Sequence, residues 1–130
     1  MYEVVPRQTD GGVIRYTAKN CCNQLLTFEI RPFGLCKYRW YAVFWITTKR
    51  NQGYQQGLQT GKDGVKSLVW AKTCLLNWIE KAKALKHDTP EYRLYIWSDD
   101  SRRFNVYKRY LIPLGFQVEQ TSDHPLVLRL

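Results

Sequence analysis

The stretch VKSLVWAKTCLLNWIEKAKAL, from Val65 to Leu85, decides the class of fold. Its apolar residues recur every three or four positions, the spacing of one face of an α-helix. That face carries Leu68, Ala71, Leu75, Trp78, Ile79 and Ala82. Before Val65 the apolar residues alternate with polar ones at every second position, which is typical of β-strands. The change of period predicts a mixed α/β (α+β) protein.

Strands are predicted on the N-terminal side of this helix. Residues 13–17 form a short candidate strand, and a second strand contains Leu26, Phe28 and Ile30 and stops at Pro32. The segment 38–48 is apolar on both faces. One face would carry Trp40, Ala42, Phe44 and Ile46, and the other Tyr41, Val43 and Trp45. We therefore expect a central strand that is covered on both sides.

The segment after the helix alternates between strand and helix again. A strand is predicted at 93–98, and a second main helix within SRRFNVYKRYLIPLGF, residues 101–116, with Gly115 as its terminator. Residues 116–119 and 126–130 then predict a closing hairpin. The order of elements predicts one domain, 1–130, with a mainly antiparallel or mixed central sheet and two main helices.

The charge balance favours polyanionic partners. Twenty Lys and Arg stand against eleven Asp and Glu, a net charge of +9. Such an excess suits nucleic acid, a nucleotide-like cofactor or an acidic protein. No apolar run is long enough to span a membrane, and the start MYEVVPRQTD lacks the apolar core of a signal peptide. A cytoplasmic location is the default expectation; the sequence does not indicate an oligomeric state.

The cysteines and histidines do not predict a metal site. Cys21, Cys22, Cys36 and Cys74 include no C-x-x-C pair, and His87 and His124 are isolated. Zinc sites need several such ligands at close spacing. We expect reduced thiols, some of them buried, and no bridge between Cys21 and Cys22.

The segment from Gln59 to Phe116 resembles the second half of the GCN5-related N-acetyltransferase (GNAT) superfamily. That family has a glycine-rich Q/R-x-x-G-x-G/A loop that opens a long helix, then a strand, a helix bearing a tyrosine, a Gly-Phe pair and two strands. Here the loop is Gln59-Thr-Gly-Lys-Asp-Gly64, and the later pair is Gly115-Phe116. The sequence departs from the family in its longer glycine spacing, in Asp63, and in having little room before residue 24 for the family's two early helices.

The loop before the long helix is the predicted phosphate site. Unpaired N–H groups at a helix start bind anions, and the glycines allow a tight backbone path. Lysines at two positions add positive charge. The resemblance implies that the pyrophosphate of acetyl-CoA binds here, at Gln59, Gly61, Lys62, Gly64, Val65 and Lys66.

The resemblance also implies an activity and a catalytic residue. The family transfers an acyl group to an amine acceptor, and a tyrosine of its last helix often protonates the departing thiolate. Tyr110 is the first candidate and Tyr107 the second. No general base can be named. Glu29 could act through a water molecule, but a glutamate that points outward from a strand is expected to be a solvated residue. A relative that binds acyl-CoA without catalysis is equally consistent with the sequence.

Two other functions remain open. The aromatic and basic residues of the central strand could stack bases and hold phosphates. They are Tyr38, Trp40, Tyr41 and Trp45, with Arg31, Lys37, Arg39, Lys49 and Arg50. A sheet face without helices would favour that interpretation. The third is a small protein-interaction factor, of the kind that phages or mobile elements encode, which the short length and basic charge would suit. The basic residues Arg102, Arg103, Lys108 and Arg109 could contact the cofactor's phosphates or an acidic partner, and the alternative is that they form the solvated face of a helix.

Overall fold

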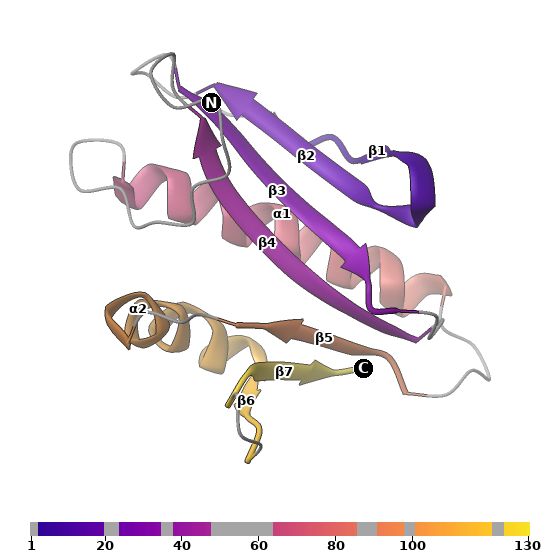
Figure 1. Cartoon of the computed structure of the whole chain (residues 1–130), viewed down its shortest axis with the longest axis vertical. Helices are drawn as coiled ribbons and strands as arrows, with labels where there is room; N and C mark the ends of the chain where they lie inside the picture. Colours follow the sequence, from indigo (N-terminus) through magenta and orange to yellow (C-terminus); the bar gives the residue numbers. More distant parts are fainter. Residues whose placement is uncertain are drawn as a thin grey trace.

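A seven-stranded sheet and two α-helices make up the described structure (Figure 1). The computed structural model describes residues 3–19, 24–34, 38–47, 64–85, 91–97, 101–120 and 124–130. The elements are β1 (Arg7–Gln8), η1 (Asp10–Gly12), β2 (Ile14–Lys19), β3 (Leu25–Pro32), β4 (Arg39–Thr47), α1 (Gly64–Leu85), β5 (Arg93–Ile96), α2 (Ser101–Leu111), η2 (Ile112–Leu114), β6 (Gln117–Val118) and β7 (Leu126–Arg129). The predicted fold class is confirmed. The strand β1 was not predicted, because its two residues are too few to show an alternating pattern.

The strands lie in the order β1-β2-β3-β4-β5-β7-β6. Every neighbouring pair is antiparallel except β4 and β5, which are parallel. A parallel pair needs a long crossover connection, and α1 lies between these two strands in the sequence. The mixed sheet is therefore a consequence of placing the long helix between β4 and β5.

The strands β4 and β5 separate soon after they pair. Their ladder joins Arg39 to Arg93, Trp40 to Leu94 and Tyr41 to Tyr95, whereas β4 continues to Thr47. On its other edge β4 pairs with β3 from Trp40 to Thr47. Figure 1 shows the resulting wedge between β4 and β5, with the start of α1 at its open end.

Both helices pack on the same face of the sheet. On this face the Tyr16 hydroxyl donates to Asn77 Oδ1 of α1 at 2.9 Å, and the Trp40 and Trp78 rings lie 5.5 Å apart. Leu111 of α2 joins the same buried cluster. Figure 1 shows α1 running behind β3 and β4. Both described helices cover one face of β4, whereas on its second face Val43 is also buried, at 5% exposure, without belonging to the core cluster on the helix side. The expectation that β4 is covered on both sides therefore stays a prediction for the second face.

The predicted apolar face of α1 is confirmed. Ala71, Leu75, Trp78, Ile79 and Ala82 are buried, and Leu68 is half-buried at the start of the row. Trp70 and Cys74 are buried beside them, and Trp70 Nε1 donates to the carbonyl of Glu3. Burial raises the pKa of the Cys74 thiol to about 12. Neither described helix combines the length and hydropathy that a membrane span would need.

The second helix ends as the sequence predicts. After Leu111 the chain tightens into η2, which contains Pro113, and Gly115 follows with φ of 106°. Its N–H donates to the carbonyl of Ile112 at 3.0 Å. This left-handed conformation suits glycine, and it turns the chain so that Phe116 is buried.

Candidate functional site

A cavity of about 70 Å³ lies where β4 and β5 diverge. We call it the cleft cavity. Its walls come from β3, β4, the end of β5, the first half of α1 and the second half of α2. They consist of Phe28, Ala42, Phe44, Leu68, Ala71, Lys72, Leu75, Ile96, Trp97, Tyr107, Tyr110 and Leu111. A space of this size accommodates a few water-sized groups.

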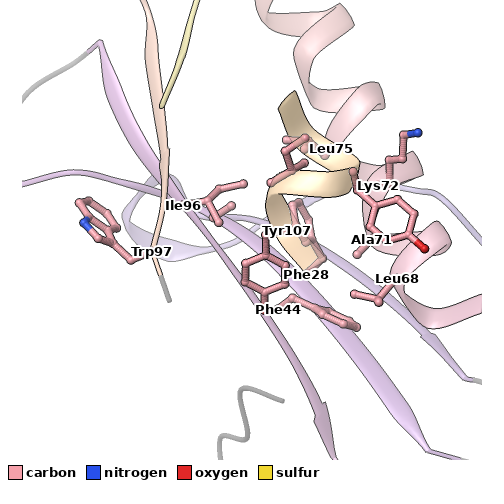
Figure 2. A pocket seen from close by; sticks show the side chains of 12 residues that line it. Phe28, Phe44, Leu68, Ala71, Lys72, Leu75, Ile96, Trp97 and Tyr107 are labelled. Atoms are coloured by element: carbon pink, nitrogen blue, oxygen red, sulfur yellow. The ribbon is translucent and has the colours of Figure 1, made fainter. Parts of the chain in front are cut away.

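The cleft cavity is apolar apart from three side chains. Figure 2 shows Phe44, Leu68 and Tyr107 around it, and the Lys72 ammonium group pointing away from it. The side chains of Ile96 and Trp97 lie on opposite sides of their strand, with Ile96 toward the cavity. Tyr107 and Tyr110 are the lining residues that carry a hydroxyl, and the rest of the wall suits a small apolar group.

The edge of β4 that faces the wedge is open. After Tyr41 no described strand pairs with this edge, although β3 pairs with the opposite edge as far as Thr47. Backbone N–H and C=O groups on an open edge are available to hydrogen-bond an extended ligand. The wedge therefore offers backbone groups along one side and an apolar cavity at its base.

The start of α1 lies beside this wedge. Leu68, in the fifth position of the helix, already lines the cleft cavity. The N–H groups of the first turn have no partner within the helix. Ser67 in that turn is buried, and its Oγ has no hydrogen-bond partner among the described residues. A ligand that reaches this turn would meet backbone N–H donors that the helix itself leaves without a partner.

The structure positions some of the predicted phosphate-site residues. Gly64 and Val65 open α1, and Lys66 is exposed in its first turn. Gln59, Gly61 and Lys62 lie outside the described residues. The prediction that these six residues form one phosphate site stays a prediction.

Both candidate tyrosines reach the cleft cavity. Tyr107 and Tyr110 are three positions apart on α2, so they share one side of the helix. Each is half-buried, and the cavity residues include no carboxylate or imidazole among the part of the chain described. Along the same helix the Lys108 ammonium group lies 5.2 Å from the centre of the Phe104 ring. Both candidate tyrosines thus line the cavity.

The expectation that Glu29 is a solvated strand residue is wrong. Its side chain is 1% exposed, and it lies on the face of the sheet that is opposite the helices. Arg15 Nε contacts one carboxylate oxygen, and Arg31 donates to the other at 2.8 Å from Nε. Burial alone would lower the pKa of Arg31, but its hydrogen bonds to Glu29 and Tyr41 raise it overall. Glu29 is an ion-pair residue and does not reach the cleft cavity.

The remaining cysteine and histidine predictions are mostly outside the described residues. This applies to Cys21, Cys22, Cys36 and His87, while Cys74 is buried and free. His124 is exposed. No group of three or more potential metal ligands occurs among the described residues.

Sequence reasoning missed most of the cavity. Phe28, Phe44 and Ile96 were assigned to the correct strand faces, but nothing in their spacing shows that β4 and β5 are neighbours. The available signal was the order strand, long helix, strand, which is the pattern of a parallel crossover.

Comparisons with protein-family models, with curated proteins and with solved structures found no match. The cleft cavity, the open edge of β4 and the first turn of α1 are therefore the features from which a function is argued.

Proposed function

We propose that this protein binds an acyl-CoA with a short acyl group in the wedge between β4 and β5. The observation that carries the proposal is the early divergence of this parallel pair above an apolar cavity and beside the start of α1. Ligands of open α/β sheets bind outside the carboxyl ends of parallel strands. Here the carboxyl end of β4 and that of β5 border the wedge.

Three parts of the chain suit three parts of an acyl-CoA. The first turn of α1 offers N–H donors for the pyrophosphate, and Lys66 adds a positive charge. The open edge of β4 offers backbone partners for the amides of the pantetheine arm. The cleft cavity, at about 70 Å³, has room for an acetyl group.

The resemblance to the GNAT superfamily agrees with this assignment. The chain has a long helix after a glycine-containing loop, then a strand, a helix with tyrosines, Gly115-Phe116 and two strands, in the order that the resemblance implies. The first 24 residues hold β1, η1 and β2 in their described part and no α-helix. The second face of the sheet consequently lacks the two early helices that the family places before its second strand.

Acyl transfer is the reaction that the cavity would support. An amine that attacks the thioester carbon forms a C–N bond, the C–S bond breaks, and coenzyme A leaves as a thiolate that needs a proton. The hydroxyl of Tyr110 or Tyr107 can donate that proton, which is general acid catalysis. The proton that the amine loses passes to solvent, because the described cavity residues include no carboxylate or imidazole. A protein that binds acyl-CoA without transferring the group is the alternative within the same proposal.

Calorimetric titration with acetyl-CoA tests this proposal. Ala71→Leu adds bulk inside the cleft cavity, whereas Ala84→Leu adds the same bulk to an exposed position of the same helix. We expect the parent chain and Ala84→Leu to bind acetyl-CoA alike, and Ala71→Leu to bind at least tenfold more weakly. Thermal unfolding of both variants controls for folding. The absence of binding to the parent, or equal binding by Ala71→Leu, would contradict the proposal.

A further inference from the structure

The cations of the strands all lie on the face of the sheet that is opposite the helices. The cross-strand register places them there, because residues that are paired across a ladder point to the same side. They are Arg7, Arg15, Lys19, Arg31, Arg39, Arg93 and Arg129. Glu29 is the one carboxylate within the described strands. We call this side of the sheet the basic face.

Several of these cations are direct neighbours. Arg39, Arg93 and Arg129 form one row across β4, β5 and β7, and Arg7 is paired with Arg15 across β1 and β2. Like charges directly opposite one another destabilise a sheet. Glu91 offsets part of the row, since its carboxylate lies 3.2 Å from Arg93 Nε and 4.0 Å from Arg129 Nε. Seven cations still face two carboxylates, so the basic face keeps an excess of positive charge.

An aromatic cluster lies next to the arginine row. The Phe33 ring is 5.5 Å from that of Tyr95 and 5.6 Å from that of Trp97, and it meets the Tyr41 ring edge-on at 6.1 Å. Tyr95 and Trp97 are stacked at 5.3 Å with their planes 13° apart. Tyr95 is buried, whereas Phe33 is 40% exposed and Tyr41 and Trp97 are half-buried. The cluster thus presents ring surface to solvent beside exposed guanidinium groups.

A second aromatic group lies on the same face. The Arg31 guanidinium lies 5.7 Å from the centre of the Trp45 ring, while it also holds Glu29. Arg31 is paired with Tyr41, which belongs to the aromatic cluster, so the two groups are adjacent. Rings and cations alternate over β3, β4 and β5, and neither described helix covers them.

We infer that the basic face binds single-stranded nucleic acid. Exposed rings offer platforms for unstacked bases, and the arginines beside them are placed to contact the phosphates. The bases of a duplex are already stacked on each other and would not use such rings. The charge excess excludes a basic or purely apolar partner, and an acidic protein would leave the ring platforms without a specific role.

The register also corrects the sequence-based choice of residues for this function. Tyr41, Trp45, Arg31 and Arg39 are on the basic face. Trp40 instead packs against Trp78 on the helix side. Tyr38 stacks against Tyr92 at 5.9 Å, and Lys37, Lys49 and Arg50 lie outside the described residues. The sheet face without helices, which would favour nucleic-acid binding, is therefore the face that carries the odd-numbered residues of β3 and β4.

This inference does not rest on acyl-CoA binding, because the residues of the cleft cavity other than Trp97 do not belong to the basic face or its aromatic cluster. The probe is a fluorescein-labelled single strand of about 15 nucleotides, as oligothymidine and as oligouridine, with anisotropy measured over about 50 to 200 mM salt. A triple variant, Arg39→Gln with Arg93→Gln and Arg129→Gln, removes the arginine row. Its matched control is Lys81→Gln with Lys83→Gln and Arg109→Gln, three exposed cations of the helices.

We expect the parent to bind the single strands more weakly as salt rises. The slope of log affinity against log salt should fall by about 2 in the triple variant, because each lost phosphate contact contributes about 0.7. The control should keep the parent slope to within about half a unit. Trp97→Ala should weaken binding by about five- to a hundredfold, while Trp97→Phe, which retains a ring, should lose far less.

Three results would overturn the inference. The first is no binding of either oligonucleotide at the lowest salt, and the second is a triple variant that behaves as its control does. The third is competition by polyglutamate as effective as competition by unlabelled oligonucleotide, which would make the basic face a site for an acidic protein. Circular dichroism melting of every variant ensures that the comparison is between folded proteins.

Discussion

Tyr41 and Tyr95 form the last pair of the parallel ladder between β4 and β5. Beyond this pair β4 runs on for six residues to Thr47, and β3 is the one described strand that pairs with it there. The separation opens the wedge between the two strands. On one side of the wedge is an edge of β4 with which no described strand pairs, and the cleft cavity lies at its base. The same two tyrosines lie on the basic face, so this pair marks the place where both candidate surfaces meet the sheet.

Removing the hydroxyl from the candidate catalytic tyrosine should separate binding from chemistry. Tyr110→Phe is expected to lower acetyl transfer to a simple amine by about a hundredfold, since a general acid contributes about that much or more. The affinity for acetyl-CoA should stay near the parent value, because the ring still lines the cavity. Tyr107→Phe serves as the paired comparison, and coenzyme A release is measured with a thiol reagent. Loss of affinity without loss of turnover in both variants would argue against a general acid on α2.

The loop before α1 should govern acyl-CoA affinity through its backbone. Gly64→Val is expected to weaken binding more than Lys62→Ala, because a branched side chain blocks close approach of the backbone while one lysine contributes a screened charge. Asp63→Asn should leave the affinity equal or higher, since it removes a negative charge near the anion. The measurement is the same calorimetric titration with acetyl-CoA. Parent-like affinity in all three variants would mean that the loop is a connector only.

The buried thiol of Cys74 should make stability depend on alkaline pH. Burial raises its pKa to about 12 from an ordinary value of 9.0, so the folded chain keeps a proton that the unfolded chain loses. Stability is therefore expected to fall as pH rises above about 9, by up to about 1.4 kcal/mol per pH unit for this group. The urea midpoint between about pH 8 and pH 10.5 measures it. Cys74→Ala should show a shallower decline, and an identical decline would remove Cys74 as the cause.

Glu29 should matter for stability and not for catalysis. Glu29→Ala leaves Arg15 and Arg31 without their shared carboxylate in a partly buried setting. We expect a loss of about 1–3 kcal/mol in the free energy of unfolding, because both guanidinium groups still reach some water. Urea unfolding gives the value, with Glu91→Ala, whose ion pairs are more exposed, as the milder comparison. Unchanged stability would mean that the buried carboxylate is no better than a neutral residue there.

The backbone conformation at position 115 should require glycine. Its φ of 106° is unfavourable for any residue with a Cβ atom, although an added Cβ would meet Leu128 Cδ1 at an ordinary 3.5 Å. Gly115→Ala is therefore expected to cost about 1–2 kcal/mol of stability through backbone strain rather than through a clash. Gly11→Ala, at a positive φ in open space, is the matched control for strain without a neighbour. A neutral Gly115→Ala variant would show that the turn can relax.

Local patterns in the sequence predicted the elements well. Alternation located β3 and β4 to within a residue or two, and the period of three to four located α1. Gly115 indicated the end of α2, because few residues other than glycine adopt the left-handed conformation that often follows a helix. These signals depend only on neighbours in the chain, which is why they could be read without a structure.

The candidate site could not be predicted from local patterns, because it is formed by contacts between segments that are distant in the sequence. Whether Trp40 or Trp45 faces the helices depends on which side α1 occupies, and the sequence leaves both sides equally apolar. The burial of Glu29 depends on Arg15 and Arg31 arriving from two strands. The cavity depends on the number of pairs that β4 makes with β5, and no local propensity encodes that number.

The most direct test of the proposed acyl-CoA site is an NMR titration of the isotope-labelled protein with acetyl-CoA, followed through its backbone amides. Binding in the wedge predicts shifts along the free edge of β4 after Tyr41, in the first two turns of α1 and around Tyr107 of α2. The amides of β1 and β2, on the far side of β3, should remain in place. A spectrum that does not change at all, or one whose shifts are confined to β1, β2 and the row of Arg39, Arg93 and Arg129, would contradict acyl-CoA binding between β4 and β5.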